Sequence, residues 1–162
     1  MRIKLITVGK IKEKSLVNLI ENYTKQMGQV EIIEIPDIDD SNGIEKEGKQ
    51  ILSKIQKDEH VVSLAIEGKT MDSIEFSQYL DKVNTHQTSR ITFIIGGSYG
   101  LSDEVKKRSQ LLLSFSKMTF PHQLMRLILI EQIYRAQQIL KKHPYHKWVK
   151  QWQYFLILME QY

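Results

Sequence analysis

Short apolar runs and longer amphipathic stretches alternate along this chain, and each kind of segment has its own period. The apolar runs are rich in isoleucine, valine and leucine and end at glycine, proline or polar residues, which is typical of buried β-strands. The stretches between them repeat apolar residues every three or four positions, as amphipathic helices do. The predicted strands are Ile3–Val8, Val30–Ile35, His60–Ile66, Ile91–Ile95 and Ser114–Phe120.

Helices are predicted in each interval between these strands and after the last one. Asp72 or Ser73 can cap the third helix, and Ser102 begins a short fourth one. Strands that alternate with helices predict an α/β fold, with helices flanking a mostly parallel sheet whose strands are buried on both faces. The predicted helices are Ser15–Met27, Ile44–Lys57, a segment through Val83, a segment from Ser102 and Gln123–Lys142.

Composition narrows the class of protein only a little. The 162 residues suffice for one domain, and the hydrophobic (41%) and charged (26%) fractions are ordinary for a globular protein. The chain has no cysteine, which excludes disulfides and thiol catalysis. The net charge is +4, with basic clusters near Lys10, Lys106 and Lys141. This excess suits a polyanionic partner without requiring one.

The sequence shows no targeting or membrane signal. Arg2 and Lys4 interrupt the first residues, so we expect no secretory signal peptide. The longest apolar runs, Leu127–Ile130 and Phe155–Met159, are too short to cross a bilayer. We therefore expect a cytoplasmic protein.

A glycine-rich turn, Gly96-Gly97-Ser98-Tyr99-Gly100, follows the predicted strand that ends at Ile95. It is not the G-x-G-x-x-G pattern of dinucleotide-binding proteins. Ligands of parallel sheets gather at the carboxyl ends of strands, so Leu64, Gly96 and residues 115–120 are expected to line one crevice. A glycine there would let a ligand approach the backbone. The same turn also suits a plain strand-to-helix connection, and the residues leave both interpretations open.

The predicted helix Gln123–Lys142 is apolar around more than one face, which a single core does not require. It is either a central core helix or one that packs on the sheet and also pairs with a second subunit, with Ile133 facing outward. Glu131 and Arg135 are four residues apart in the favourable order and are expected to form a stabilising ion pair.

The segment His143-Pro144-Tyr145-His146-Lys147 comes directly after this helix. Its two histidines have a spacing that some metal sites use, but the sequence offers no third ligand of matching kind nearby, so we expect no metal. A solvated helix end rich in histidine and lysine is the plainest interpretation, because such residues favour the carboxyl end of the helix dipole.

Taken in order, the glycine turn, the segment Ser114–His122 and His143–Lys147 resemble the RlmH family of ribosomal RNA methyltransferases in the SPOUT superfamily. The likeness runs from the first strand to Lys147. It implies a SPOUT-type trefoil knot in the C-terminal third of the chain, a homodimer, and S-adenosylmethionine as cofactor. The implied reaction is methylation of N3 of a pseudouridine in 23S ribosomal RNA, on assembled ribosomes.

The resemblance also implies roles for individual residues. Tyr145, His146 and Lys147 are expected to bind substrate and take part in catalysis. His146 would accept the N3 proton or orient the base, Tyr145 would stack on the base, and Lys147 would pair with a phosphate. The residues expected to hold S-adenosylmethionine are Leu64, Gly96, Phe115, Ser116, Lys117, Met118, Thr119 and Phe120.

Two segments depart from the family pattern. The loop 37–43 is short and acidic, and an apolar extension, 148–162, follows the single domain of residues 1–147. Two other functions therefore stay open: a related SPOUT enzyme with a changed RNA target, and a non-catalytic module of the same fold that binds RNA or a nucleotide.

Overall fold

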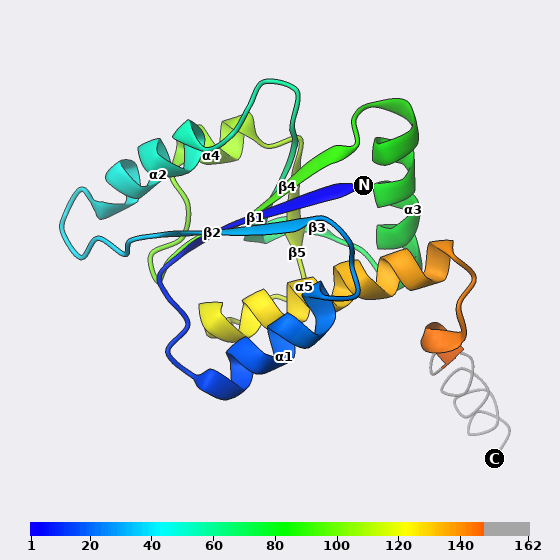
Figure 1. The fold of residues 1–162 in the computed structure, drawn as a ribbon. Coiled ribbons are helices and arrows are strands. Elements are labelled where there is room, and N and C mark those ends of the chain that lie inside the picture. Colours follow the sequence, from blue (N-terminus) through cyan, green and yellow to red (C-terminus); the bar gives the residue numbers. More distant parts are fainter. Residues whose placement is uncertain (148–162) are drawn as a thin grey trace, which may run out of the picture.

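The computed structural model describes residues 1–147 of the chain, and the predicted extension 148–162 lies outside the described residues. Its centre is a five-stranded sheet in which every paired strand runs parallel to its neighbour, in the order β2-β1-β4-β3-β5 (Figure 1). The strands are β1 (Arg2–Val8), β2 (Val30–Ile35), β3 (His60–Thr70), β4 (Arg90–Ile95) and β5 (Leu111–Ser114).

Within residues 1–147, five α-helices cover the two faces of this sheet, as predicted for an α/β fold. Helices α1, α3 and α5 pack on one face, and α2 and α4 pack on the other (Figure 1). A 3-10 helix, Pro144–Lys147, folds back against α5. The α-helices are α1 (Lys14–Thr24), α2 (Gly43–Ser53), α3 (Ser73–His86), α4 (Asp103–Arg108) and α5 (His122–Leu140).

Helix starts follow the predicted capping chemistry. The Asp72 side chain accepts a hydrogen bond from the Glu75 backbone N–H, and Glu75 reaches back to the Asp72 N–H, which completes a capping box. Ser102 caps α4 by accepting from the Val105 N–H. The predicted cap of α3 is confirmed, with Asp72 rather than Ser73, and so is the predicted start of α4 at Ser102.

The predicted strand Ser114–Phe120 is wrong. Strand β5 occupies the preceding residues and ends at Ser114, and the segment that follows it is a loop. The Ser114 hydroxyl donates to the Ser116 carbonyl, and the Ser116 hydroxyl accepts from the Met118 N–H. These local bonds give the backbone a partner other than a neighbouring strand.

The expectation that all strands are buried on both faces is wrong for β2. This strand lies at an edge of the sheet, and Glu31, Ile32 and Glu34 are exposed. Strand β3 is also longer than predicted and irregular, because both Leu64 and Lys69 align with Leu113 of β5. The intervening residues bulge away at the carboxyl end of the strand.

Helix α5 lies between α1 and α3, and this position explains its unusual apolar content. Ile133 is completely buried in the core of a single chain, so its predicted outward orientation is wrong. Leu124 and Leu140, near the two ends of α5, are the exposed apolar residues of this helix. No helix in the described range 1–147 has the length and apolarity needed to cross a membrane.

Candidate functional site

A cavity of about 800 Å³ opens at the carboxyl ends of β3, β4 and β5. The strand ends, the glycine turn and the loop after β5 form its walls, as the sheet topology predicts. Its volume lies within the range of pockets that bind small molecules and cofactors.

Most of the residues predicted to hold a cofactor meet in this cavity. Lys117 belongs to the same loop and is exposed, but it does not line the cavity. The other seven do line it: Leu64, Gly96, Phe115, Ser116, Met118, Thr119 and Phe120.

The glycine turn is closed by its own backbone. The Gly100 N–H donates to the Gly97 carbonyl at 3.1 Å, and Gly100 has a φ of +88°, which glycine adopts without strain. A Cβ on Gly96 would lie 2.6 Å from the Gly100 carbonyl oxygen. Gly96 is therefore required by the turn itself, which is one of the two interpretations that the sequence left open.

An ion pair at the edge of the cavity was missed by the sequence reasoning. Lys106 of α4 donates to a Glu67 carboxylate oxygen at 2.6 Å, and both residues line the cavity. The hydrogen bond from Lys106 holds the pKa of Glu67 below its usual value. Glu67 thus presents a carboxylate that suits a cationic group of a ligand. The two residues are 39 positions apart and share no local motif, so nothing in the sequence indicated that they form a pair.

A second cavity, of about 570 Å³, lies next to the first. Phe115 and Phe120 line both cavities, whereas His146, Asp72 and Gln132 line only the second. Within one chain, the structure therefore places the C-terminal motif beside the predicted cofactor residues and not among them. Lys147 ends the 3-10 helix, and its side chain is not part of the described structure.

The pair Glu131–Arg135 forms as predicted, but it has a larger role than stabilising its helix. Arg135 Nη2 and Nε lie 2.6 and 3.0 Å from Glu131 Oε1, and the Tyr145 hydroxyl donates to the same oxygen at 3.2 Å. The guanidinium carbon lies 5.0 Å from the centre of the Tyr145 ring. The pair therefore anchors the C-terminal motif on α5.

Tyr145 is fixed from several sides. Its ring meets the edge of Tyr134 at a centroid distance of 4.9 Å, and its hydroxyl lies 3.5 Å from that of Tyr23 on α1. Burial first, and then the neighbouring Tyr23 and Glu131, raise the pKa of Tyr145. Its hydroxyl is therefore protonated at neutral pH and acts as a hydrogen-bond donor.

Arg126 lies near the start of α5 and pairs with a carboxylate. Its Nη1 donates to Glu34 Oε2 and its Nη2 to the Gly9 carbonyl, both at 3.0 Å. Its side chain is only 3% exposed. Arg126 thereby holds the loop after β1 against the end of β2.

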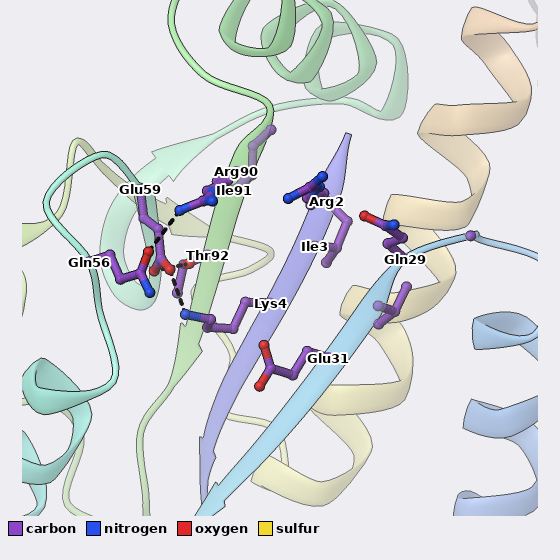
Figure 2. A pocket seen from close by; sticks show the side chains of 12 residues that line it. Arg2, Ile3, Lys4, Gln29, Glu31, Gln56, Glu59, Arg90, Ile91 and Thr92 are labelled. Carbon is purple, nitrogen blue, oxygen red and sulfur yellow. Dashed lines mark hydrogen bonds and ion pairs between the residues drawn. The ribbon is translucent and has the colours of Figure 1, made fainter.

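A third hollow, of about 500 Å³, lies at the opposite edge of the sheet, at the amino ends of β1, β2 and β4 (Figure 2). Its charged residues are largely paired. Lys4 and Thr92 both donate to the buried Glu59 carboxylate, and Arg90 donates to Gln56 and pairs with Asp58. This network joins β1 and β4 to the segment before β3 and suits a structural role.

The described residues contain no cluster of three or more histidine, aspartate or glutamate side chains that could hold a metal ion.

Comparison with known proteins shows the family of this chain. The family model described as predicted SPOUT methyltransferase matches residues 1–146. The ribosomal RNA large subunit methyltransferase H of Acholeplasma laidlawii is 61% identical over 147 residues, which cover 91% of this chain and all of that protein. The protein of the same name from Listeria monocytogenes is 49% identical, with the same coverage of both chains.

Solved structures agree on the fold. A probable methylase family protein of Haemophilus influenzae matches with a TM-score of 0.54 at 12% identity, over 98% of this chain and 77% of the other. A methyltransferase of Legionella pneumophila in complex with its bound cofactor SAM matches with a TM-score of 0.51 at 13% identity, over 84% of this chain and 66% of that one. The family match covers nearly the whole described chain. The chain therefore belongs to the SPOUT methyltransferase family and, within it, to the group of the ribosomal RNA large subunit methyltransferase H proteins.

Proposed function

We propose that this protein is an S-adenosylmethionine-dependent methyltransferase that modifies N3 of a pseudouridine in 23S ribosomal RNA. The observation that carries the proposal is the 61% identity to a ribosomal RNA large subunit methyltransferase H over that protein's full length. We place the reaction in the cytoplasm, on assembled ribosomes. The trefoil knot implied by the family resemblance stays part of the proposal.

The cavity at the carboxyl edge of the sheet fits the cofactor. Leu64, Phe115 and Phe120 supply apolar surface for an adenine ring, and Glu67 supplies a carboxylate for a cationic group. When bound, S-adenosylmethionine would supply an activated methyl group from its sulfonium. Methyl transfer to a ring nitrogen mainly requires that the nitrogen be positioned against this methyl group, with loss of the N–H proton.

The direct test is mass spectrometry of 23S ribosomal RNA from a strain in which the gene is deleted, before and after complementation with this protein. We expect one pseudouridine to lose its N3 methyl group in the deletion strain and to regain it on complementation. Methylation restored at a different nucleotide would identify a changed target. An unchanged methylation pattern, with cofactor binding intact in calorimetry, would favour the non-catalytic module.

The cofactor assignment predicts the effect of filling the cavity. Thr119 lies in the exposed loop after β5 and lines the cavity, so Thr119→Trp adds bulk inside the cavity without disturbing the core. We expect the Kd for S-adenosylmethionine, measured by titration calorimetry, to rise at least about tenfold, which corresponds to about 1.4 kcal/mol. Thr85→Trp, the same change at an exposed position on α3, is the matched control and should leave the Kd unchanged. Equal affinities in both variants would place the cofactor elsewhere.

We propose a homodimer, as the family resemblance implies. Ile133 no longer supports this assembly, but Leu124 is 37% exposed near the cavity end of α5 and is a candidate contact. We expect the wild-type chain to be a dimer by light scattering after size exclusion, and Leu124→Glu to shift it toward monomer. An active wild-type monomer at assay concentration would contradict this assembly.

A further inference from the structure

The orientation of the His146 ring is set by one contact on α5. Arg135 Nη1 lies 3.4 Å from His146 Nδ1. A guanidinium has only donors and stays protonated at all relevant pH values, so the facing ring nitrogen must present its lone pair. The proton of a neutral His146 ring is then on Nε2.

Arg135 is itself held in place, which makes this contact more than a chance approach of a mobile side chain. Two of its nitrogens bond to Glu131, and its plane lies over the Tyr145 ring. Tyr145 in turn donates to Glu131. The Glu131 carboxylate therefore fixes both Tyr145, which precedes His146, and Arg135, which faces its ring.

The charges around His146 favour the neutral ring. Arg135 and Glu131 face it from α5, and Asp72 faces it from the start of α3. Burial lowers the pKa of His146 first, and Arg135 lowers it further, whereas Asp72 and Glu131 act in the opposite direction. The net direction is downward, so the ring is neutral at neutral pH.

The other ring nitrogen, Nε2, is buried and has no hydrogen-bond partner among the residues that the structure describes. The ring lines the second cavity, which Phe115 and Phe120 separate from the predicted cofactor cavity. A buried N–H without a partner carries a desolvation cost that an acceptor on a bound ligand would remove.

We propose that Arg135 is a positioning residue that fixes His146 as the Nε2–H tautomer, so that His146 donates a hydrogen bond to a carbonyl oxygen of the target pyrimidine instead of accepting the N3 proton. The inference rests on the proposed function. N3 lies between two carbonyl groups, and loss of its proton spreads negative charge onto their oxygens. A preorganised donor at one of these oxygens stabilises that charge as it develops.

The reaction is balanced without a protein base. N3 forms the new N–CH₃ bond with the electron pair that its N–H bond leaves behind, and the proton passes to solvent water. The S–CH₃ bond of the bound cofactor breaks, and its electron pair stays on sulfur.

Nitrogen-15 NMR of the full-length protein tests the tautomer without any methylation assay. We expect the His146 signals, assigned by their loss in His146→Gln, to show a single neutral form protonated on Nε2. Exposed His86 of the same chain is the reference for exchanging tautomers.

In Arg135→Met, we expect His146 to become a mixture of tautomers with a raised pKa, because the donor and its positive charge are lost. Tyr145→Phe keeps the ring under Arg135 and should leave the tautomer unchanged. A wild-type ring protonated on Nδ1, or an unchanged tautomer in Arg135→Met, would overturn the proposal.

Kinetics test the donor role separately. Glutamine places an amide N–H near the position of Nε2, whereas asparagine places one near Nδ1. We expect His146→Gln to keep at least about a tenth of the wild-type kcat and His146→Asn to lose about 100-fold, a typical cost of one oxyanion donor. Equal losses in the two variants would contradict the donor role. A base with the lowered pKa of His146 would already be deprotonated at neutral pH, so kcat would no longer rise above it, whereas we expect kcat to keep rising as N3–H itself ionises.

The two sets of experiments fail in different ways. If the protein methylates no ribosomal RNA, the proposed function falls, but the NMR result still decides whether Arg135 sets the tautomer. If methylation occurs and the tautomer is wrong, only this inference falls. Arg135→Lys keeps both a donor near Nδ1 and a cation for Glu131. Only recovery of the Nε2–H tautomer in NMR, together with part of the kcat lost in Arg135→Met, therefore supports the positioning role.

Discussion

Replacing His146 with alanine is expected to lower the kcat for ribosome methylation by about 100-fold or more, because the hydrogen bond to the reacting base is lost. His146 lies in a cavity next to the predicted cofactor cavity, on a segment that Glu131 and Arg135 hold in place. The KM for ribosomes should change little, because most of the binding energy for an RNA of this size comes from phosphate contacts elsewhere. Single-turnover methylation of ribosomes lacking the modification, at saturating S-adenosylmethionine, measures the effect.

His86→Ala is the matched control for this variant. His86 lies at the C-terminal end of α3 and is exposed to solvent, so its loss should leave kcat within about twofold of wild type. If the kcat of His146→Ala equalled that of the control, His146 would have no part in the methyl-transfer step.

Mixed dimers extend the test to the arrangement of the two cavities. A Thr119→Trp chain has a blocked cofactor cavity and an intact motif, and a His146→Ala chain has the reverse. If each motif acts on the cofactor of its own chain, a dimer with one chain of each kind contains no complete site. Recovery of activity on mixing would show that the motif of one chain serves the cavity of the other.

Replacing Gly96 with alanine is expected to weaken S-adenosylmethionine binding by at least about tenfold and to lower the free energy of unfolding by about 1 to 3 kcal/mol. The added Cβ would lie 2.6 Å from the Gly100 oxygen and 2.8 Å from the Gly100 carbonyl carbon. The backbone of the turn must therefore move, and this turn forms one wall of the predicted cofactor cavity. Titration calorimetry and urea denaturation measure the two effects.

Gly97→Ala tests whether the effects of Gly96→Ala come from the close approach at that position or from the loss of any glycine in the turn. Its Cβ would first meet the Val8 side chain, at 3.1 Å, and a side chain can shift where a backbone carbonyl cannot. We expect a smaller loss of stability than in Gly96→Ala. If the two variants lost equal stability, the close approach at Gly96 would not be the cause.

The strand and helix pattern could be predicted because each segment carries its own period. Strand β2 was predicted with its observed bounds, and the order of strands and helices is as expected. The error at Ser114–Phe120 has a physical reason. Polar residues separate Phe115, Met118 and Phe120, which suits a strand, but a strand also needs a neighbour. Here β3 pairs with the residues just before this segment, and the Ser116 side chain bonds to the loop instead.

The apolar excess of α5 shows a second limit of pattern reasoning. The sequence shows that Ile133 lies on an apolar face, but it does not show which element covers that face. In the structure, α1 and α3 flank α5, and Ile133 is completely buried in the core that the sheet and these helices form within one chain. An inferred subunit contact was therefore an internal one, because the periodicity of a helix records burial without recording the partner.

By itself, the sequence determined the α/β fold class, the convergence of strand ends on one cavity and the ion pair between Glu131 and Arg135, because these depend on local periods, parallel strand direction and helical spacing. Only the tertiary structure decided what that pair acts upon. Lys142 has a φ of +56° after the end of α5 and turns the chain, so that Tyr145 and His146 fold back onto the helix that carries Arg135. The tautomer of His146 depends on this contact across eleven positions, and a contact between separate segments is formed by packing rather than by any repeat in the sequence.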